Sequence, residues 1–569
     1  MEAVIVAPLL EVLFGRLTSS VAGEVQTRRD FKKETEKLRN MLPVIQGVIE
    51  EAEEQQMKDK KVRGWLVKLK EVACDADDLL DEISTLLLRR QLKEVTDGDA
   101  ADLFAKLVRK LNRIPNTMEL FGLRLRRIRQ RTTYKLLKLN ELRGKLKIKH
   151  LEYVLPYSTY EDFRKWVEST NFYSLELLWG NDDEGAAFPI WMNMSGLESL
   201  TQLNLINCRN CESLPTLGQL PVLKILNIQG MDSVVNIGVE FSGEGDRPFS
   251  SLKELTLRDF PELKTWSSVD SAEAFICLDK LIITKCPLLI TMPWFPRLKY
   301  LELQKCNQLI VRSASELNTL STLVIDFFQD LFFLPKKLLQ NNSRLMSLTV
   351  TSCPKLGSVP ENLANLADLK SLKIGWCDEL KTLPHGLKSL TSLENLDIIE
   401  CPSLICLPEE GMEGLCSLRS FSIENCPRLT SLPMGMKHLI ALENLTIMFC
   451  SNLVHLPDNF HCLVELRSMT ILSCPELASL PEGLQHLKKL QILELRSCPK
   501  LMELPNWVEH LVSLRSLAIS NCPNIKSLPE GLGRLSALQH LSIRDCPDLE
   551  HHSEATHCIH VTKSLVLKN

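Results

Sequence analysis

Leucine and isoleucine return at fixed offsets along most of the chain, in the frame LxxLxIxxCPxLxxLPxxL. Between residues 353 and 546 the frame repeats every 24 or 25 residues. A period of this length predicts a solenoid in which each repeat adds one short strand to a curved parallel sheet. Because strand side chains alternate between two faces, the leucines point inward and the residues between them line the concave face.

Strand signatures predict about fifteen regular repeats between residues 200 and 550. Residues 132–199 carry a weaker form of the pattern and are expected to be a degraded lead-in or linker, and residues 551–569 a C-terminal cap or tail. Each regular repeat places a branched apolar residue or leucine at the same inward position, namely Leu205, Ile228, Leu257, Ile283, Leu303, Ile325, Val350, Ile374, Ile398, Ile423, Ile447, Ile471, Leu495, Ile519 and Ile543.

Residues 1–131 show a different pattern, with apolar residues at helical spacing. One such stripe contains Trp65, Leu66, Leu69 and Val72. Four amphipathic segments are expected, and short polar joints favour an antiparallel four-helix bundle. The predicted fold is therefore multidomain, an all-α bundle followed by an α/β leucine-rich-repeat solenoid with a concave parallel sheet.

Proline follows the cysteine and the last leucine of most repeats. Proline fixes φ and lacks a backbone donor, so neither segment is expected to continue as a strand. The convex side is predicted to be irregular and rich in turns, with the parallel sheet confined to the concave side.

Twelve of the 19 cysteines occupy one repeat position, where they would stack as small buried groups. Such a ladder of thiols indicates a reducing compartment. Glu2 and Glu11 are unlike a signal peptide, and no stretch of ~18 uninterrupted apolar residues occurs. We expect a soluble, cytoplasmic protein.

The net charge is only −4, which does not favour nucleic acid or an anionic membrane as the partner. The sequence LRLRRIRQR is the strongest local exception. A solvated face of the last helix is favoured over a nucleic-acid or lipid patch there.

The concave residues are mixed, small and polar, which suits protein recognition through a few aromatic and charged anchors. The candidate partner-binding residues on this face are Lys373, Trp376, Asp397, Glu494, Arg496 and Arg544. Glu400, Phe449 and Asp545 share the row of Trp376.

The sequence gives little support for a metal site, a nucleotide site or catalysis. Cys208 and Cys211 lack the second pair that a zinc site needs, and the segment HHSEATHCIH is expected to be a terminal cap rather than a metal site. No GxxxxGK[ST] phosphate loop occurs. We expect no catalytic residues, metal or cofactor, and therefore no enzyme.

Four stretches resemble plant coiled-coil disease resistance receptors of the NLR type, with an Rx N-terminal domain and leucine-rich repeats. They are MEAVIVAPLLEVLFGRLTS, VRGWLVKLKEVACDADDLLDEI, LNELRGKLKIKHLEYV and LPTLGQLPVLKILNIQGMDSVVNIGVEF. Such receptors carry a nucleotide-binding NB-ARC switch between bundle and repeats, whereas here IRQR runs directly into TTYKLLKLNELRGKL.

The resemblance implies that Asp77, Asp78 and Asp81 form the acidic motif that docks the bundle onto basic repeat residues. A solvated acidic helix face remains an equal alternative. The resemblance also implies membrane contact only if the first helix is released.

The leading hypothesis is an innate immune protein that acts by protein recognition without its own switch. Its partners would be a pathogen effector, a guarded host protein or a full-length receptor, with self-association through the bundle. Two alternatives stay open, a repeat adaptor unrelated to defence and a truncated receptor product that modulates full-length receptors.

Overall fold

The computed structural model divides the chain into two compact units, residues 1–139 and 140–569. It describes residues 66, 67, 69–71, 73, 74, 78, 144–149, 172–179, 188, 197, 199–243, 247–267, 273–547, 549 and 565–567. Each unit is described separately below.

The described residues of the first unit are helical. Leu66, Leu69 and Ala73 are fully buried, whereas Lys70 and Asp78 are exposed. Burial at this spacing is that of one face of an amphipathic helix. The other predicted helical segments lie outside the described residues, so the four-helix bundle stays a prediction.

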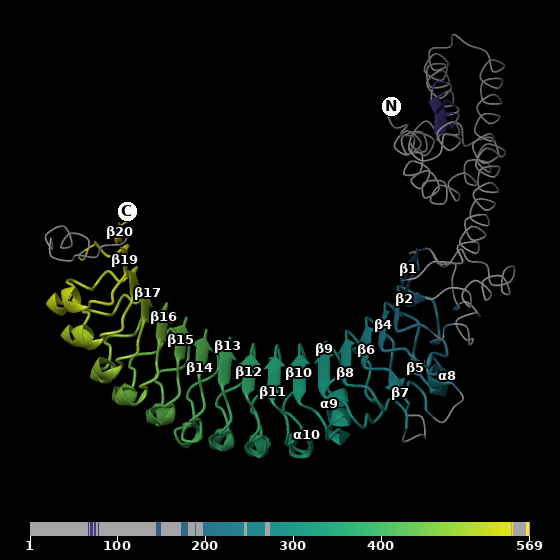
Figure 1. Cartoon of the computed structure of the whole chain (residues 1–569), viewed down its shortest axis with the longest axis horizontal. Helices are drawn as coiled ribbons and strands as arrows, with labels where there is room; N and C mark the ends of the chain where they lie inside the picture. Colours follow the sequence, from purple (N-terminus) through teal and green to yellow (C-terminus); the bar gives the residue numbers. More distant parts are fainter. Residues whose placement is uncertain are drawn as a thin grey trace, which may run out of the picture. The chain divides into compact units, whose positions relative to one another are not determined.

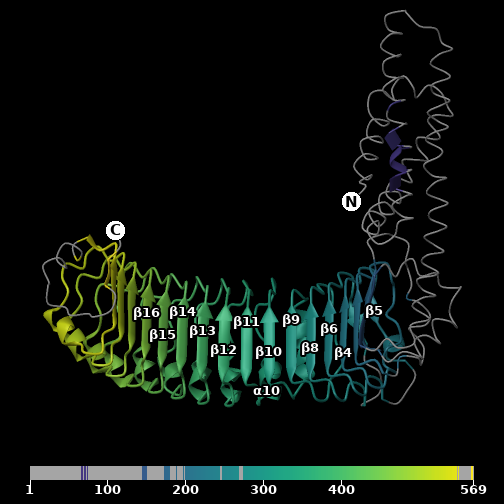
Figure 2. The ribbon, with the colours of Figure 1, turned by 45° about the horizontal axis from the view of Figure 1, so that its top comes forward.

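The second unit is built on one parallel sheet of eighteen described strands, which line the inner side of the solenoid (Figure 1). Consecutive repeats supply neighbouring strands, and Figure 2 shows the strands side by side. Their bounds are β1 (Gly144–Lys149), β2 (Phe172–Leu178), β3 (Gln202–Ile206), β4 (Ile225–Gln229), β6 (Glu254–Arg258), β8 (Lys280–Thr284), β9 (Tyr300–Gln304), β10 (Thr322–Asp326), β11 (Ser347–Thr351), β12 (Ser371–Gly375), β13 (Asn395–Ile399), β14 (Ser420–Glu424), β15 (Asn444–Met448), β16 (Ser468–Leu472), β17 (Ile492–Arg496), β18 (Ser516–Ser520), β19 (His540–Arg544) and β20 (Leu565–Leu567).

Fifteen of these strands, β3 to β19 without β5 and β7, each contain one of the inward residues predicted from the sequence. From β3 to β19 every strand pairs with the next in the same register, for example Leu396 with Phe421 and Phe421 with Leu445. These three side chains are almost completely buried. Strand alternation therefore places one continuous apolar core directly behind the sheet.

Two strands lie in the degraded lead-in, and one lies in the predicted tail. β1 pairs with β2 and β2 with β3, so the sheet begins before the regular repeats. β20 pairs with β19, Leu541 opposite Leu565. This last strand extends the sheet where only a cap or tail was expected.

The convex side is more regular than predicted, because short helices recur there. They are α8 (Val239–Ser242), α9 (Leu309–Ser313), η3 (Ala314–Glu316), α10 (Lys336–Asn341), η4 (Glu361–Asn365), η5 (His385–Ser389), η6 (Glu410–Met412), η7 (Met434–His438), η8 (Asp458–Cys462), η9 (Glu482–His486), η10 (Asn506–His510) and η11 (Glu530–Arg534), where η denotes a 3₁₀ helix. A proline in extended conformation directly precedes most of the 3₁₀ helices, as Pro384 does before η5 and Pro481 before η9. A proline before the first turn of a helix removes no helical hydrogen bond. The prolines were predicted to keep the convex side irregular, but in the structure they mark where the short helices begin.

The parallel pairing is also not confined to the concave side. A second sheet joins β5 (Asn236–Ile237) to β7 (Thr265–Trp266). Isolated bridges add Phe333 to Ser358 and Thr382 to Cys406. Proline shortens these outer strands, as expected, but residues between the prolines still pair.

The repeat cysteines form the predicted ladder of buried thiols. From Cys286 to Cys546 each repeat cysteine donates its thiol to the carbonyl oxygen two residues before it, at 3.2 Å in Cys353 and 3.6 Å in Cys474. All eighteen cysteines among the described residues are free. Burial raises the pKa of the Cys353 thiol to about 11 and that of Cys426 to about 12.

The rate of alkylation should distinguish these buried thiols from the exposed ones. The thiolate is the reactive form, and at pH 8 these pKa values leave roughly one Cys353 thiol in a thousand and one Cys426 thiol in ten thousand ionised. Iodoacetamide is therefore expected to modify exposed Cys406 and Cys416 at least about tenfold faster than Cys353 and Cys426. Mass spectrometry of the native protein measures the rates, and equal rates at all four positions would contradict the ladder.

Candidate protein-binding face

One backbone feature marks the end of every regular strand. The residue directly before the repeat cysteine, or before its apolar replacement, has a positive φ in all fifteen regular repeats; these residues are Asn207, Gly230, Asp259, Lys285, Lys305, Phe327, Ser352, Trp376, Glu400, Asn425, Phe449, Ser473, Ser497, Asn521 and Asp545. Only six are Gly, Asn or Asp, the residues that tolerate this region. The others hold a conformation that costs roughly 1–2 kcal/mol per residue.

The sheet itself holds these residues in place. The backbone amide of Trp376 donates to the carbonyl oxygen of Ile399 on the next strand at 2.8 Å, and that of Phe449 donates to Leu472 at 2.8 Å. The left-handed turn thus extends the hydrogen-bond ladder by one residue. We call these fifteen residues the turn row.

Three members of the turn row are aromatic and exposed. Phe327 is 41% exposed, Trp376 45% and Phe449 47%, at φ of 60°, 51° and 56°. All fifteen repeats share this conformation, so it belongs to the repeat, and these three positions are distinguished by their exposed aromatic rings. The Nζ of Lys305, in the same row, lies 4.4 Å from the centre of the Phe327 ring, so a cation can sit over an aromatic ring here.

A shallow hollow of about 560 Å³ lies on the concave side of β10, β11 and β12, lined by Asp326, Thr349, Thr351, Ser352, Lys373 and Trp376. Both carboxylate oxygens of Asp326 are occupied, since the Thr351 hydroxyl donates to one at 2.7 Å and the Gln304 amide to the other at 2.7 Å. The hollow therefore offers an indole face, an ammonium group and hydroxyls.

Carboxylates gather on the next two strands. Glu400 accepts a hydrogen bond from the Asn425 amide, and Glu424 accepts one from the Ser422 hydroxyl at 2.9 Å. Burial raises the pKa of Asp397, the charge of Glu424 raises it further, and the nearby Lys373 lowers it. Within the described residues none of these three carboxylates forms an ion pair.

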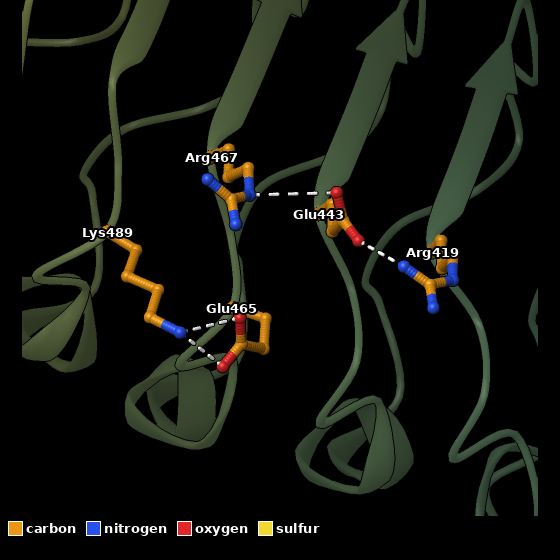
Figure 3. A network of polar contacts seen from close by, with 5 residues as sticks. All are labelled: Arg419, Glu443, Glu465, Arg467 and Lys489. Atoms are coloured by element: carbon orange, nitrogen blue, oxygen red, sulfur yellow. Dashed lines mark hydrogen bonds and ion pairs between the residues drawn. The ribbon is translucent and has the colours of Figure 1, made fainter.

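At the opposite edge of the same strands the charged side chains form ion pairs. Directly before β14, β15 and β16 lie Arg419, Glu443 and Arg467, and Figure 3 shows the glutamate between the two arginines. The carboxylate of Glu443 lies 2.6 Å from the guanidinium of Arg419 and 3.6 Å from that of Arg467. Lys370 and Glu394 continue this pairing at 3.1 Å. The unpaired negative charge is therefore a property of the edge that carries the turn row.

The structure brings some of the predicted site residues together and separates others. Lys373, Trp376 and Asp397 share the adjacent strands β12 and β13 and the turns that follow them. Glu494 and Arg496 form their own ion pair at 3.2 Å on β17. At the usual strand spacing, β17 lies about 24 Å from β12. Arg544 is exposed at the end of β19, still further along the sheet.

The acidic motif of the first unit is only partly visible. Asp78 is an exposed helical residue. Asp77 and Asp81 lie outside the described residues, so docking of this motif onto the repeats stays a prediction.

Sequence reasoning missed Asp326, Phe327 and Glu424 as members of the concave face. Phe327 precedes Phe328, which takes the place of the repeat cysteine. Aligning that repeat on Phe328 would have put Phe327 in the row of Trp376. Glu424 stands in the row of Arg496, where only arginines were selected.

A long parallel sheet of in-register repeats, with leucine and isoleucine behind it and 3₁₀ helices outside, defines the leucine-rich repeat class. Comparison with known families agrees. Residues 174–231 and 501–546 match the R13L1/DRL21 leucine-rich repeats, and residues 9–117 match the Rx N-terminal domain. The chain thus combines an Rx N-terminal domain with these repeats, and no nucleotide-binding domain was detected.

Curated relatives include RGA4 and RGA2 of Solanum bulbocastanum, both named disease resistance proteins. They are 39% and 38% identical to this chain over 80 residues, which is 14% of this chain and 8% of each relative. Among solved structures, a leucine-rich repeat protein of Leptospira interrogans covers 72% of this chain and 98% of its own length, with a TM-score of 0.52 and 24% identity. That likeness concerns the fold alone.

Within the part of the chain that the structure describes, no helix has the length and apolar character needed to cross a bilayer.

Proposed function

We propose that the protein acts in plant disease resistance by binding another protein on the concave face of its repeats. The observation that carries this is the turn row, which holds Trp376 and Phe449 exposed at a conformational cost. Aromatic side chains that become buried on binding dominate the energy of protein interfaces, so exposed rings on a row that the sheet holds in place favour a docking surface. The relatives named above support the link to resistance.

The proposal includes the absence of catalysis and of an intrinsic nucleotide switch. The hollow beside Trp376 is shallow and holds no pair of groups suited to acid and base or nucleophilic work. Activity would then be controlled by the partner, whether a pathogen effector, a guarded host protein or a full-length receptor. The eighteen cysteines among the described residues are free, which supports a cytoplasmic location.

Expression of the full chain in leaf tissue tests this function. We expect it to change the cell death triggered by a co-expressed resistance receptor, measured as ion leakage, and to co-precipitate a defence protein. The double variant Trp376→Ala, Phe449→Ala should lose at least half of the effect at equal protein level, because it removes both exposed rings. Met434→Ala, which truncates a side chain that is 53% exposed on the convex helix η7, is the matched control.

Unchanged ion leakage and no co-precipitated defence protein would contradict the resistance role. Retention of the full effect by the double variant would contradict the concave face as its binding surface. Binding of a protein outside defence through this same face would favour the adaptor alternative.

A further inference from the structure

The chemistry of one stretch of the concave sheet selects a particular class of partner. We propose that the face formed by Trp376, Asp397, Glu400, Glu424 and Phe449, called the acid-aromatic face, binds an extended segment rich in arginine from a partner protein. This inference rests on the proposed role of the concave face in protein recognition and specifies the chemistry of the segment it takes.

The first argument is charge. Asp397 lies on β13, Glu424 on β14, and Glu400 in the turn directly after β13. The neighbouring cation is the ammonium of Lys373. No ion pair within the described residues neutralises these three carboxylates, although ion pairs occur at the other edge of the same strands. A cationic segment would supply the missing counter-charges, and the short hydrogen bonds of arginine to carboxylates are among the stronger polar contacts in proteins.

The second argument is the placement of the two rings. In the turn row Trp376 and Phe449 flank Glu400 and Asn425, and each of the four follows one of four adjacent strands. A guanidinium group can stack on an aromatic face while it bonds a neighbouring carboxylate. The ammonium of Lys305 lies over the Phe327 ring in the same row, which shows that a cation can stack on a ring at this position of the repeat.

The third argument is length. Three strand spacings separate Trp376 from Phe449, about 14 Å in a parallel sheet. An extended segment of about four residues covers that distance. Every strand here is already paired on both sides, so the segment cannot add as another strand and must bind through its side chains.

The same charge argues against nucleic acid. Phosphate backbones bind where lysine and arginine replace their counterions, and this face presents the opposite sign. A small polyamine shares the cationic chemistry but would not need the two rings to be spaced for an extended chain. The occupant we favour is therefore a protein segment.

Fluorescence anisotropy with the purified full chain tests the proposal. The probe is a labelled peptide of about eight residues that alternates arginine with glycine, long enough to span the face. We expect it to bind the protein at least about tenfold more tightly than the same peptide with glutamate in place of arginine, and to bind less tightly as salt is added. Spermine should compete only weakly.

Variants locate the site. Asp397→Asn, Glu400→Gln and Glu424→Gln together should weaken binding by about tenfold, since each exposed charge pair contributes roughly 0.2–1 kcal/mol. Trp376→Ala should weaken it by about two- to fivefold, the scale of an exposed cation-π contact. Glu482→Gln, at an exposed carboxylate on the convex helix η9, is the matched control and should leave binding within twofold. Circular dichroism checks that each variant is folded.

The proposal is overturned if the arginine peptide binds no better than the glutamate peptide, or if the triple variant binds as well as the unmodified protein. Equal competition by spermine would assign the face to small polyamines instead. If peptide binding fails while the leaf response still depends on Trp376 and Phe449, the proposed function stands and this assignment of its partner is wrong.

Discussion

Replacing Phe421 by alanine is expected to lower the free energy of unfolding by about 3–5 kcal/mol, the usual cost of truncating a buried phenylalanine. The ring lies on β14 with no exposed surface, between Leu396 and Leu445 of the neighbouring strands. Each repeat is supported only by its neighbours, so the cavity should loosen β13 to β15 first. Chemical denaturation measures the loss, and hydrogen exchange shows where it falls.

Phe449→Ala provides a control with the same chemical change one repeat away. Phe449 is 47% exposed and is not part of the buried core, so the loss should be about 1 kcal/mol or less. The two variants thus separate folding from recognition, because the second should affect partner binding and the first stability. Equal stability of the two variants would show that the core behind β14 is not packed as described.

Gly414→Ala is expected to destabilise the protein by about 1–3 kcal/mol or more, although it adds only one methyl group. A Cβ at Gly414 would lie 1.5 Å from the carbonyl oxygen of Lys388 and 2.5 Å from its carbonyl carbon. Lys388 belongs to η5 of the previous repeat, so the clash is between backbones and no side-chain rotation relieves it. Neighbouring convex segments would have to move apart.

Gly357→Ala is the matched control, because no atom lies within 4 Å of a Cβ built there. Its thermal midpoint should equal or slightly exceed that of the unmodified protein, since alanine reduces the freedom of the unfolded chain. Differential scanning calorimetry on both variants makes the comparison. A Gly414→Ala midpoint as high as that of Gly357→Ala would rule out the close approach to Lys388.

The strands could be predicted closely because two periods agree in each repeat. Alternation by two decides which side chains face inward, and the repeat length decides where the next strand begins. Ile423 and Ile447 illustrate this, since both are fully buried and directly opposite each other. The short β20 escaped prediction because three residues carry too little alternation, and it pairs only because the edge of β19 is available.

The turn row could not be predicted from residue preference. Lys285, Trp376 and Glu400 disfavour a positive φ, and only the ladder of neighbouring strands holds them there. The candidate site could be predicted only in part, because it too depends on which side chains neighbouring repeats bring together. Trp376 and Asp397 were found as concave residues, but the unpaired state of the carboxylates depends on which side chains the fold brings within reach.

The regular register has a consequence for how such a chain can change over generations. Ser468 of β16 and Ser516 of β18 both lie opposite Ile492 of β17, one on each side. Unequal recombination that removed residues 474–497 would join Ser473 to Cys498 and leave those two serines opposite each other. A deletion that joined two strands one residue out of this frame would turn the leucines of the joined strand toward water. Whole repeats can therefore be lost or copied, and a recognition surface can be lengthened or shortened in steps of about 4.8 Å while its core stays sealed.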